Sequence, residues 1–429
     1  MFHSLGCGFP QSKAFGGQQT LMNTALSKAT GAVAQLGARA TAVTGTYVAA
    51  TAVMLLAVIV LRGMAAPALL RNLLGLIFLM SLSAGLEPGT IKAAALSEVG
   101  VEGADPVAYL GVGALKGALA SPFLAVIWRL ADPTIPFSTL AWTPLIAVAG
   151  FWATDIRVLL DLRGRHTLAV GLKQGSLAGG VAVVGLLVAV RTPLVWAVGA
   201  STFARLALPL LVVALLRRAP SSGPVWREAR RLLGDNRWVD LAAVSVIAAV
   251  GGSVDRVIGL RLLSPADYGA YYLIYELLTK FWLIPFVLGP ILFARRAVGD
   301  ESDSLMRGAW GLTAVAGTAF LTVVGGVLVV APTLLVQLVG ASFGMAPFGF
   351  AMGVVVGSLV QLQIAHLQGA GHGRRTAVAM GLSALLSAPM FWVCSSFFGT
   401  GGLLWAFLAK TSLELALVSW RSQARGTWA

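Results

Sequence analysis

Apolar runs of about 20 residues recur along almost the whole chain, and they constrain its fold more than any other feature. A helix needs about 20 apolar residues to cross the hydrocarbon core of a bilayer. Because lipid offers no hydrogen-bond partners to the backbone, each run is predicted to be a helix. Twelve runs reach roughly this length: residues 40–61, 67–86, 107–131, 138–160, 168–190, 194–216, 239–261, 269–293, 309–331, 346–369, 376–398 and 401–420.

The composition agrees with a membrane protein. Hydrophobic residues make up 57% of the chain and charged residues 11%, whereas soluble domains have about 25% charged residues. The mean hydropathy is +0.84. The net charge of +14 comes from residues in short loops between apolar runs. We interpret these charges as topology signals and contacts to lipid headgroups, and we expect no nucleic-acid partner.

The basic residues alternate between loops in the way that the positive-inside rule requires. The loops after the fourth, sixth, eighth and tenth runs are basic, and the opposite loops are poor in Lys and Arg. Lys173 is assigned to the loop after the fourth run. This pattern predicts a bacterial inner-membrane protein with both termini in the cytoplasm. The loop between the second and third runs is the exception, because it is acidic.

An internal repeat relates the two halves of the chain. "GRHT" at 164–167 matches "GRRT" at 373–376, and "WAVGASTFARLAL" at 196–208 matches "WAFLAKTSLELAL" at 405–417, both at an offset of 209 residues. Chance similarity between Ala-, Leu- and Gly-rich helices is the alternative. The repeat predicts an all-α protein of two six-helix bundles around a central cleft, where repeated transporters place their substrate site.

The repeat and the loops together set the expected domain boundaries. They are a partly disordered tail at 1–37, a six-helix bundle at 38–216, a cytoplasmic linker at 217–238, a second six-helix bundle at 239–420 and a cytoplasmic tail at 421–429. Residues 1–21 are expected to add no packed structure, because they are rich in Gly, Gln and Ser and lack a signal-peptide core. Residues 332–347 are expected to form a re-entrant or interfacial segment.

Three stretches resemble one family of bacterial exporters. "SVDRVIGLRLLSPADYGAYYLIYELLTKFWLIPFVLGPILFARRA" at 253–297, "HLQGAGHGRR" at 366–375 and "GLEPGTIKAAAL" at 85–96 resemble the polysaccharide and oligosaccharide-lipid flippase branch of the multidrug/oligosaccharidyl-lipid/polysaccharide (MOP) exporter superfamily. The family often repeats its "L-S-P-x-x-Y/F-G" turn after the first span, and here "LRGMAAPALLRNLLG" stands in that place.

The resemblance implies a function in surface polysaccharide biosynthesis. The expected activity is transfer of a polyprenyl-pyrophosphate-linked glycan across the inner membrane, without enzymatic activity or a cofactor. Further partners that it suggests are membrane lipids, a polysaccharide polymerase and a chain-length regulator. Two alternatives stay open. One is a drug/cation antiporter of the same superfamily, and the other is a membrane-embedded polysaccharide polymerase or glycosyltransferase, although no long charged extracytoplasmic loop favours an enzyme.

Ionisable side chains inside the runs are the candidate site residues, since a charge at mid-bilayer costs about 2.5–3.5 kcal/mol. We expect four cations to face the cleft and bind pyrophosphate: Lys116, Arg205, Arg256 and Lys280. Three carboxylates are candidates for coupling or ion pairing: Asp255, Glu276 and Glu414.

Less specific interpretations compete with these assignments. Glu276 precedes Lys280 by four residues, which favours mutual neutralisation on one helix face. Arg205 and Glu414 occupy equivalent positions of the repeat. A salt bridge between them, joining the two halves, is therefore the alternative to a cleft-facing Arg205. Arg157 is interpreted as extending to the interface. Aromatic residues are interpreted as packing or interfacial groups rather than sugar platforms: Trp142, Trp152, Tyr271, Tyr272, Tyr275 and Trp282. Cys7 and Cys394 lie far apart in the sequence, so we expect no disulfide between them. The sequence has no metal-ligand spacing.

Overall fold

In the computed structural model, every regular element of the described residues is a helix. The structure describes residues 44–61, 63, 67–86, 106–163, 165–216, 237–297, 304–340 and 342–423. The predictions for residues 1–21, for both tails and for nearly all of the linker at 217–238 lie outside these residues.

The helices follow the apolar runs closely. After the helix at Thr44–Leu61, the first half contains α2 (Pro67–Gly85), α4 (Pro106–Ala131), α5 (Phe137–Leu140), α6 (Thr143–Leu162), α7 (His166–Ala189) and α8 (Leu194–Leu216). The second half contains α10 (Arg237–Gly251), α11 (Val254–Leu262), α12 (Pro265–Leu278), the 3₁₀ helix η1 (Thr279–Trp282), α13 (Leu283–Ala297), α14 (Ser304–Val330), α15 (Pro332–Val339), α16 (Ala346–Gly369) and α17 (Gly373–Gln423).

Ten described helices are long and apolar enough to cross a membrane, and Leu69–Ser83 is a shorter apolar helix. The last of the ten contains a sharp break at Gly399, where φ is 55° and ψ is −139°. Residues other than glycine rarely adopt this backbone conformation. The break divides α17 into two helices, so the described segments provide twelve passages and the fold class predicted from the sequence is confirmed.

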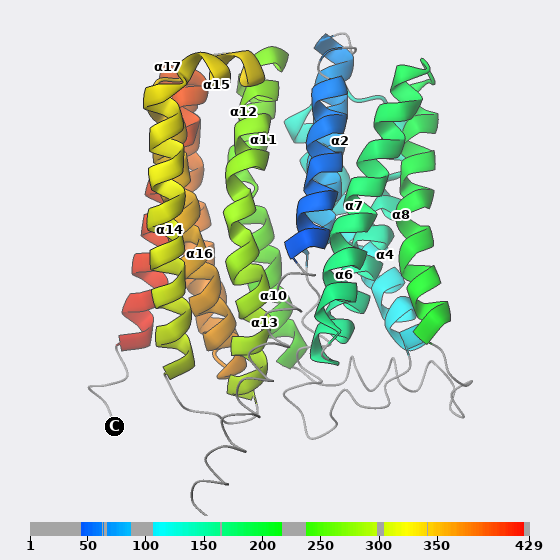
Figure 1. Cartoon of the computed structure of the whole chain (residues 1–429). Coiled ribbons are helices and arrows are strands. Elements are labelled where there is room, and N and C mark those ends of the chain that lie inside the picture. Colours follow the sequence, from blue (N-terminus) through cyan, green and yellow to red (C-terminus); the bar gives the residue numbers. More distant parts are fainter. Residues whose placement is uncertain are drawn as a thin grey trace, which may run out of the picture.

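The helices form two bundles that stand side by side (Figure 1). The helix at Thr44–Leu61, α2, α4, α6, α7 and α8 form the N-terminal bundle. The helices α10 to α14, α16 and α17 form the C-terminal bundle, and α15 lies across its upper end (Figure 1). The two bundles meet where α2 contacts α10, α11 and α12, where α4 contacts α11, and where α6 contacts α13.

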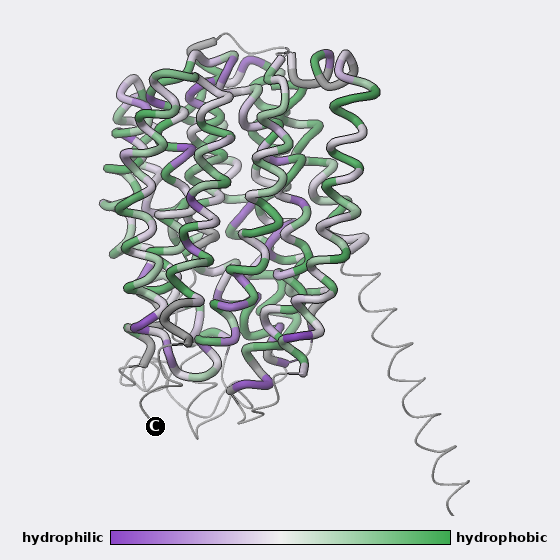
Figure 2. The backbone as a smooth tube through the Cα atoms, turned by 90° about the vertical axis from the view of Figure 1, so that its left-hand side faces the viewer, coloured by the Kyte–Doolittle hydropathy of each residue, from purple (hydrophilic) through white to green (hydrophobic). Residues whose placement is uncertain are grey.

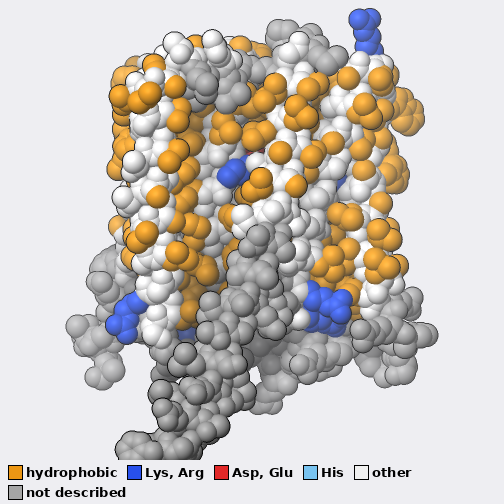
Figure 3. Space-filling model, in the orientation of Figure 1, with side chains coloured by type: hydrophobic (Ala, Val, Ile, Leu, Met, Phe, Trp, Pro, Cys, Tyr) orange, Lys and Arg blue, Asp and Glu red, His pale blue; other side chains and the backbone are white. Residues whose placement is uncertain are grey.

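The outer surface of the bundles is apolar along most of its height. Large hydrophobic side chains are strongly exposed there, among them Leu119 at 73%, Phe397 at 77% and Val330 at 84%. Figure 2 shows hydrophobic residues along the length of the helices. Figure 3 shows basic side chains at the lower end of one face, with others at mid-height and at the upper end. A soluble protein rarely exposes such a surface, whereas lipid is a good solvent for it.

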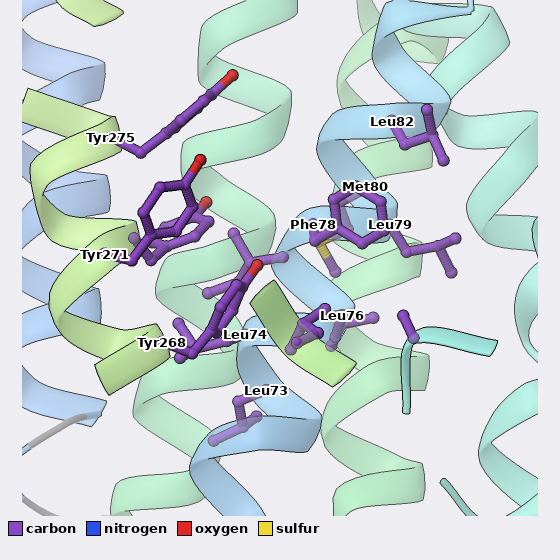
Figure 4. Packing of buried hydrophobic residues seen from close by; sticks show 14 of the residues in the cluster. Leu73, Leu74, Leu76, Phe78, Leu79, Met80, Leu82, Tyr268, Tyr271 and Tyr275 are labelled. Carbon is purple, nitrogen blue, oxygen red and sulfur yellow. The ribbon is translucent and has the colours of Figure 1, made fainter. Parts of the chain in front are cut away.

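The core continues from one bundle into the other. Leu73, Leu74 and Phe78 of α2 face Tyr268 and Tyr271 of α12 (Figure 4). One hydrogen bond also joins the bundles, because Nη2 of Arg71 donates to the carbonyl oxygen of Leu263 at 2.9 Å. Arg71 lies near the start of α2 and Leu263 directly follows α11. The end of α11 and the start of α2 are at the upper end of the bundles, so the bundles are joined there (Figure 1).

Two apolar runs are interrupted in the structure, which hydropathy alone did not predict. The run at 239–261 breaks after Gly251, and the next run divides into α12, η1 and α13. The amide of Gly252 still donates to the carbonyl of Ala248, but that of Ser253 donates to Val250, so the bonding pattern tightens there. Consecutive glycines favour such a break, because glycine has a low helix propensity.

Candidate binding cavity between the bundles

A cavity of about 370 Å³ lies between the two bundles. Its walls come from α2, α6 and α7 on one side and from α10 to α13 and α16 on the other. Many lining residues lie near the lower ends of α6, α13 and α16 (Figure 1). Its polar lining consists of Ser81, Arg157, Asp161, Lys173, Ser245, Ser253, Arg256, Tyr275, Trp282, Gln361 and Gln368.

The charged lining of this cavity is predominantly basic. Arg157, Lys173 and Arg256 are its three basic residues, and Asp161 is its one carboxylate, which gives a formal balance of +2. Nε of Arg157 lies 3.2 Å from Oδ2 of Asp161, one turn further along α6. One carboxylate can offset only one of the three cations, so the lining as a whole keeps an excess of positive charge. The cavity is therefore suited to an anionic group.

Arg256 is held at the break between α10 and α11. Its Nη2 donates to the carbonyl oxygen of Gly252 at 3.0 Å and to Oγ of Ser253 at 2.9 Å. Its Cζ lies 4.8 Å from the ring centroid of Tyr275 and 5.3 Å from that of Phe78. Because Phe78 belongs to α2, the guanidinium contacts aromatic rings of both bundles. The helix break thus places a fixed cation between them.

The carboxylate next to Arg256 is already engaged by another group. The hydroxyl of Tyr271 donates to Oδ2 of Asp255. Oδ1 of Asp255 lies 4.0 Å from Nε of Arg256, at the outer limit of an ion pair. Asp255 is 1% exposed and does not line the cavity. It therefore neutralises Arg256 only in part, and the side of Arg256 that faces the cavity keeps positive potential.

An aromatic residue joins the bundles at the wall of the cavity. The ring of Phe286 on α13 lies 4.1 Å from Cζ of Arg157 and 5.4 Å from Nζ of Lys173. The ring of Tyr47 lies 6.1 Å from it, centroid to centroid. Cation–π contacts of this kind contribute about 0.5–2 kcal/mol each. Phe286 thus connects the C-terminal bundle to the cations of the N-terminal one.

Of the four cations predicted for the cleft, Arg256 lines this cavity, and the other three are not among its lining residues. Lys280 nevertheless lies between the bundles, because its Nζ is 5.7 Å from the ring centroid of Tyr47. Nζ of Lys116 lies 4.0 Å from Oδ1 of Asp155, between α4 and α6. Nζ of Lys280 lies 2.6 Å from Oε2 of Glu276, which is the pair that the spacing of four residues indicated.

Arg205 and Glu414 do not form the bridge that their repeat positions suggested. Nη2 of Arg205 is 3.3 Å from the carbonyl oxygen of Met80 and 3.4 Å from Oγ of Ser83, both on α2. Oε1 of Glu414 lies 3.0 Å from Nζ of Lys410, one turn earlier on α17. Each residue thus has its contacts within its own bundle, because the nearest polar partner lies there.

Two cavity residues were interpreted differently from the sequence. Arg157 was assigned to the interface and Lys173 to a loop, but Lys173 lies within α7 and both line the cavity. The signal that indicates this site is the interruption of one apolar run at Gly251 and Gly252 and of the next at η1, directly before the proline-containing α13. Discontinuous helices mark the binding sites of many transporters.

The aromatic residues serve mainly in packing. Tyr275 and Trp282 line the cavity, and the indole of Trp282 donates to the carbonyl oxygen of Val354 at 3.1 Å. The indole of Trp152 donates to the carbonyl oxygen of Leu110 at 2.8 Å. The ring of Trp142 packs directly against Gly199, where an added Cβ would lie 2.6 Å from its Cζ2 atom. Tyr271 and Tyr272 are buried.

Comparisons with known proteins identify the fold. No family model and no curated protein matches this sequence. Among solved structures, an outward-facing multidrug resistance MATE family transporter of the MOP superfamily matches with a TM-score of 0.60 and 14% identity, over 90% of this chain and 94% of that one. An inward-facing multidrug resistance MATE family transporter of the MOP superfamily matches with a TM-score of 0.56 and 14% identity, over 88% of this chain and 96% of that one.

A third structure carries a statement about its pocket. A MOP superfamily transporter from Pyrococcus furiosus matches with a TM-score of 0.56 and 12% identity, over 90% of this chain and 96% of that one. It is described as having a binding pocket of reverse polarity, which suggests a different function for it. At these identities the three matches show that the chain has the MATE transporter fold.

Proposed function

We propose that this protein is a flippase that carries a polyprenyl-pyrophosphate-linked oligosaccharide from the cytoplasmic to the periplasmic leaflet of a bacterial inner membrane. The observation that carries the proposal is the basic cavity between the bundles, with Arg157, Lys173 and Arg256 against Asp161. A pyrophosphate head needs a polar, cationic passage, while its polyprenyl tail stays in lipid. The transporter fold supports movement of one bundle against the other around such a cavity.

The structure supports a starting state for this cycle. Arg71 and Leu263 join the bundles at the upper end, whereas the cavity reaches toward the lower ends of α6, α13 and α16. If the basic loops at the lower end are cytoplasmic, as the positive-inside rule predicts, the cavity faces the cytoplasm. That is the side on which a lipid-linked oligosaccharide is assembled and from which it must leave.

A drug/cation antiporter is the second candidate, because a multidrug resistance transporter has the same fold. An organic cation is best held by carboxylates or by aromatic rings free of a cation. Here the rings of Tyr275 and Phe286 are in contact with Arg256 and Arg157, and the one carboxylate of the lining is paired. The cavity therefore favours an anionic cargo.

The test compares both cargoes in proteoliposomes that contain the purified protein. One assay follows a fluorescent polyprenyl-pyrophosphate disaccharide between leaflets, and the other follows uptake of a cationic dye. We expect transfer of the lipid and no uptake of the dye. Dye uptake without lipid transfer would establish the antiporter and end the flippase proposal. A reporter fused after residue 231 tests the orientation, because the linker is expected in the cytoplasm.

Cavity variants connect the activity to the charges. Arg256→Gln should lower lipid transfer about tenfold, since one charge-assisted contact contributes about 1.5–3 kcal/mol, and Arg256→Gln combined with Lys173→Gln should abolish it. Arg261→Gln is the matched control, because Arg261 is exposed at the end of α11 and does not line the cavity. Equal transfer by the double variant and the control, at equal protein levels, would contradict the role of the cavity.

A further inference from the structure

The N-terminal bundle buries a cation that the cavity does not use. Arg205 lies midway along α8, is 1% exposed and does not line the cavity. Of its three nitrogens, Nη2 has acceptors, at the long distances of 3.3 Å to the carbonyl oxygen of Met80 and 3.4 Å to Oγ of Ser83. Nε and Nη1 have no hydrogen-bond partner among the described residues. The guanidinium thus keeps most of its donors unsatisfied in the interior of the bundle.

No carboxylate of the described residues forms an ion pair with Arg205. The two carboxylates inside α6 have other partners, since Asp155 lies near Lys116 and Asp161 near Arg157. A guanidinium stays protonated in proteins, and an uncompensated buried ion costs several kcal/mol. A group that neutralises this charge would therefore stabilise the bundle by a large amount.

The surroundings limit the size of that group. Cβ of a side chain at Gly180 would lie 2.7 Å from Cδ and 2.8 Å from Cγ of Arg205, so the aliphatic part of the arginine fills the space above this glycine. Ser83 is equally confined, because Cβ of a side chain at Gly150 would lie 2.5 Å from its Oγ. Packing this tight on two sides of the side chain disfavours a ligand as large as a phosphate or a sugar, so a counter-ion at Nε and Nη1 has to be small.

We propose that Arg205 holds a small monovalent anion of the halide class, with chloride as the physiological species, at its Nε and Nη1 groups. The anion supplies the negative charge that the bundle lacks, and it occupies a site separate from the cavity. The proposal does not depend on the cargo, since an anion site within one bundle is equally compatible with flippase and antiporter activity.

Thermal unfolding of the purified full-length protein tests the site. Chloride is compared with gluconate at one pH and ionic strength, and fluoride, bromide and iodide extend the series. A ligand that binds the folded state raises its melting temperature as its concentration rises. We expect chloride and bromide to raise the melting temperature by about 2 °C or more, and we expect no rise for Arg205→Gln. The control Arg261→Gln should respond like the unchanged protein. Equal melting temperatures in chloride and gluconate for the unchanged protein would overturn the proposal.

A second measurement does not require any variant to fold. Crystals of the unchanged protein grown in bromide should show an anomalous scattering peak beside Nε and Nη1 of Arg205. A well-ordered Arg205 with water there and no bromide peak would overturn the proposal. Arg205→Lys, which keeps the charge but has fewer donors, should keep a weaker melting response to chloride. A full chloride response in Arg205→Gln would place the anion elsewhere and contradict the assignment.

Discussion

One pair of repeated positions is charge-neutral in the C-terminal bundle and carries a net positive charge in the N-terminal bundle. With the offset of 209 residues, Ser201 and Arg205 of α8 correspond to Lys410 and Glu414 of α17. In the C-terminal bundle the two residues form an ion pair at 3.0 Å and cancel each other's charge. In the N-terminal bundle Oγ of Ser201 donates to the carbonyl oxygen of Val198, and Arg205 is left without a carboxylate among the described residues. The first arrangement is self-contained, whereas the second requires an external counter-charge.

The same difference extends to the other buried charges. The described cations inside the C-terminal bundle lie near carboxylates of their own span: Arg256 near Asp255, Lys280 near Glu276 and Lys410 near Glu414. In the N-terminal bundle Lys116 reaches Asp155 on another helix. Arg157 and Asp161 of α6 form a local pair in the N-terminal bundle as well. The two bundles therefore differ at Lys116 and Arg205, whose charges depend on another helix or on a ligand.

The largest effect is expected from breaking the local pair. Glu414→Gln leaves Lys410 charged and 4% exposed without its partner. Removal of one member of a buried ion pair costs about 3–5 kcal/mol, so the melting temperature of the purified protein should fall sharply. The double variant Lys410→Met/Glu414→Leu removes both charges and should recover most of the loss. Equal loss in the single and double variants would show that the pair is not the source of the stability.

A smaller effect is expected where Arg205 is packed. Gly180→Ala places Cβ 2.7 Å from Cδ of Arg205, and overpacking of this kind costs about 1–3 kcal/mol. Gly179→Ala is the matched control, because nothing lies within 4 Å of its new Cβ and alanine has the higher helix propensity. Thermal unfolding should place Gly180→Ala below the unchanged protein and Gly179→Ala at or above it. A stabilising Gly180→Ala would contradict the tight packing of Arg205.

These contrasts separate what the sequence predicts from what it does not. The apolar runs at 194–216 and 346–369 coincide with α8 and α16, because lipid imposes both length and hydrophobicity on a helix. The Glu276–Lys280 pair was predicted for a similar reason, since spacing along one helix fixes which side chains meet.

Contacts between helices were not predicted. The approach of Lys116 to Asp155 depends on the register of α4 against α6, and the cavity positions of Arg157 and Lys173 depend on how the bundles face each other. Hydropathy averages over about 20 residues, so it passes over a break as short as 251–253. The two consecutive glycines, Gly251 and Gly252, were the sequence signal for that break. The break in turn sets the position of Arg256.

A still smaller effect is expected where the charges of the two bundles meet. Phe286→Leu removes the ring that contacts Arg157 and Lys173 but keeps an apolar side chain. The lost cation–π energy is about 1 kcal/mol, so we expect a slightly lower melting temperature. Phe286→Tyr keeps the ring and should behave like the unchanged protein. If Phe286→Leu and Phe286→Tyr unfold at the same temperature, the ring does not connect the bundles.

The smallest effect tests whether the N-terminal bundle can be made self-contained like its counterpart. Ser201→Asp places a carboxylate one turn before Arg205, in the order that favours pairing on a helix. The desolvation cost of burying a new carboxylate offsets most of the gain from neutralising Arg205, and the Ser201 hydrogen bond is lost, so the melting temperature in gluconate should rise only slightly. The decisive measurement is the rise in melting temperature that chloride causes. This rise should shrink or vanish, because the carboxylate introduced at position 201 competes with chloride for the guanidinium of Arg205. Ser201→Asn has a similar size without the charge and should keep the full response. A full chloride response in Ser201→Asp would mean that Arg205 and the new carboxylate do not interact, and that the correspondence with Lys410 and Glu414 does not extend to geometry.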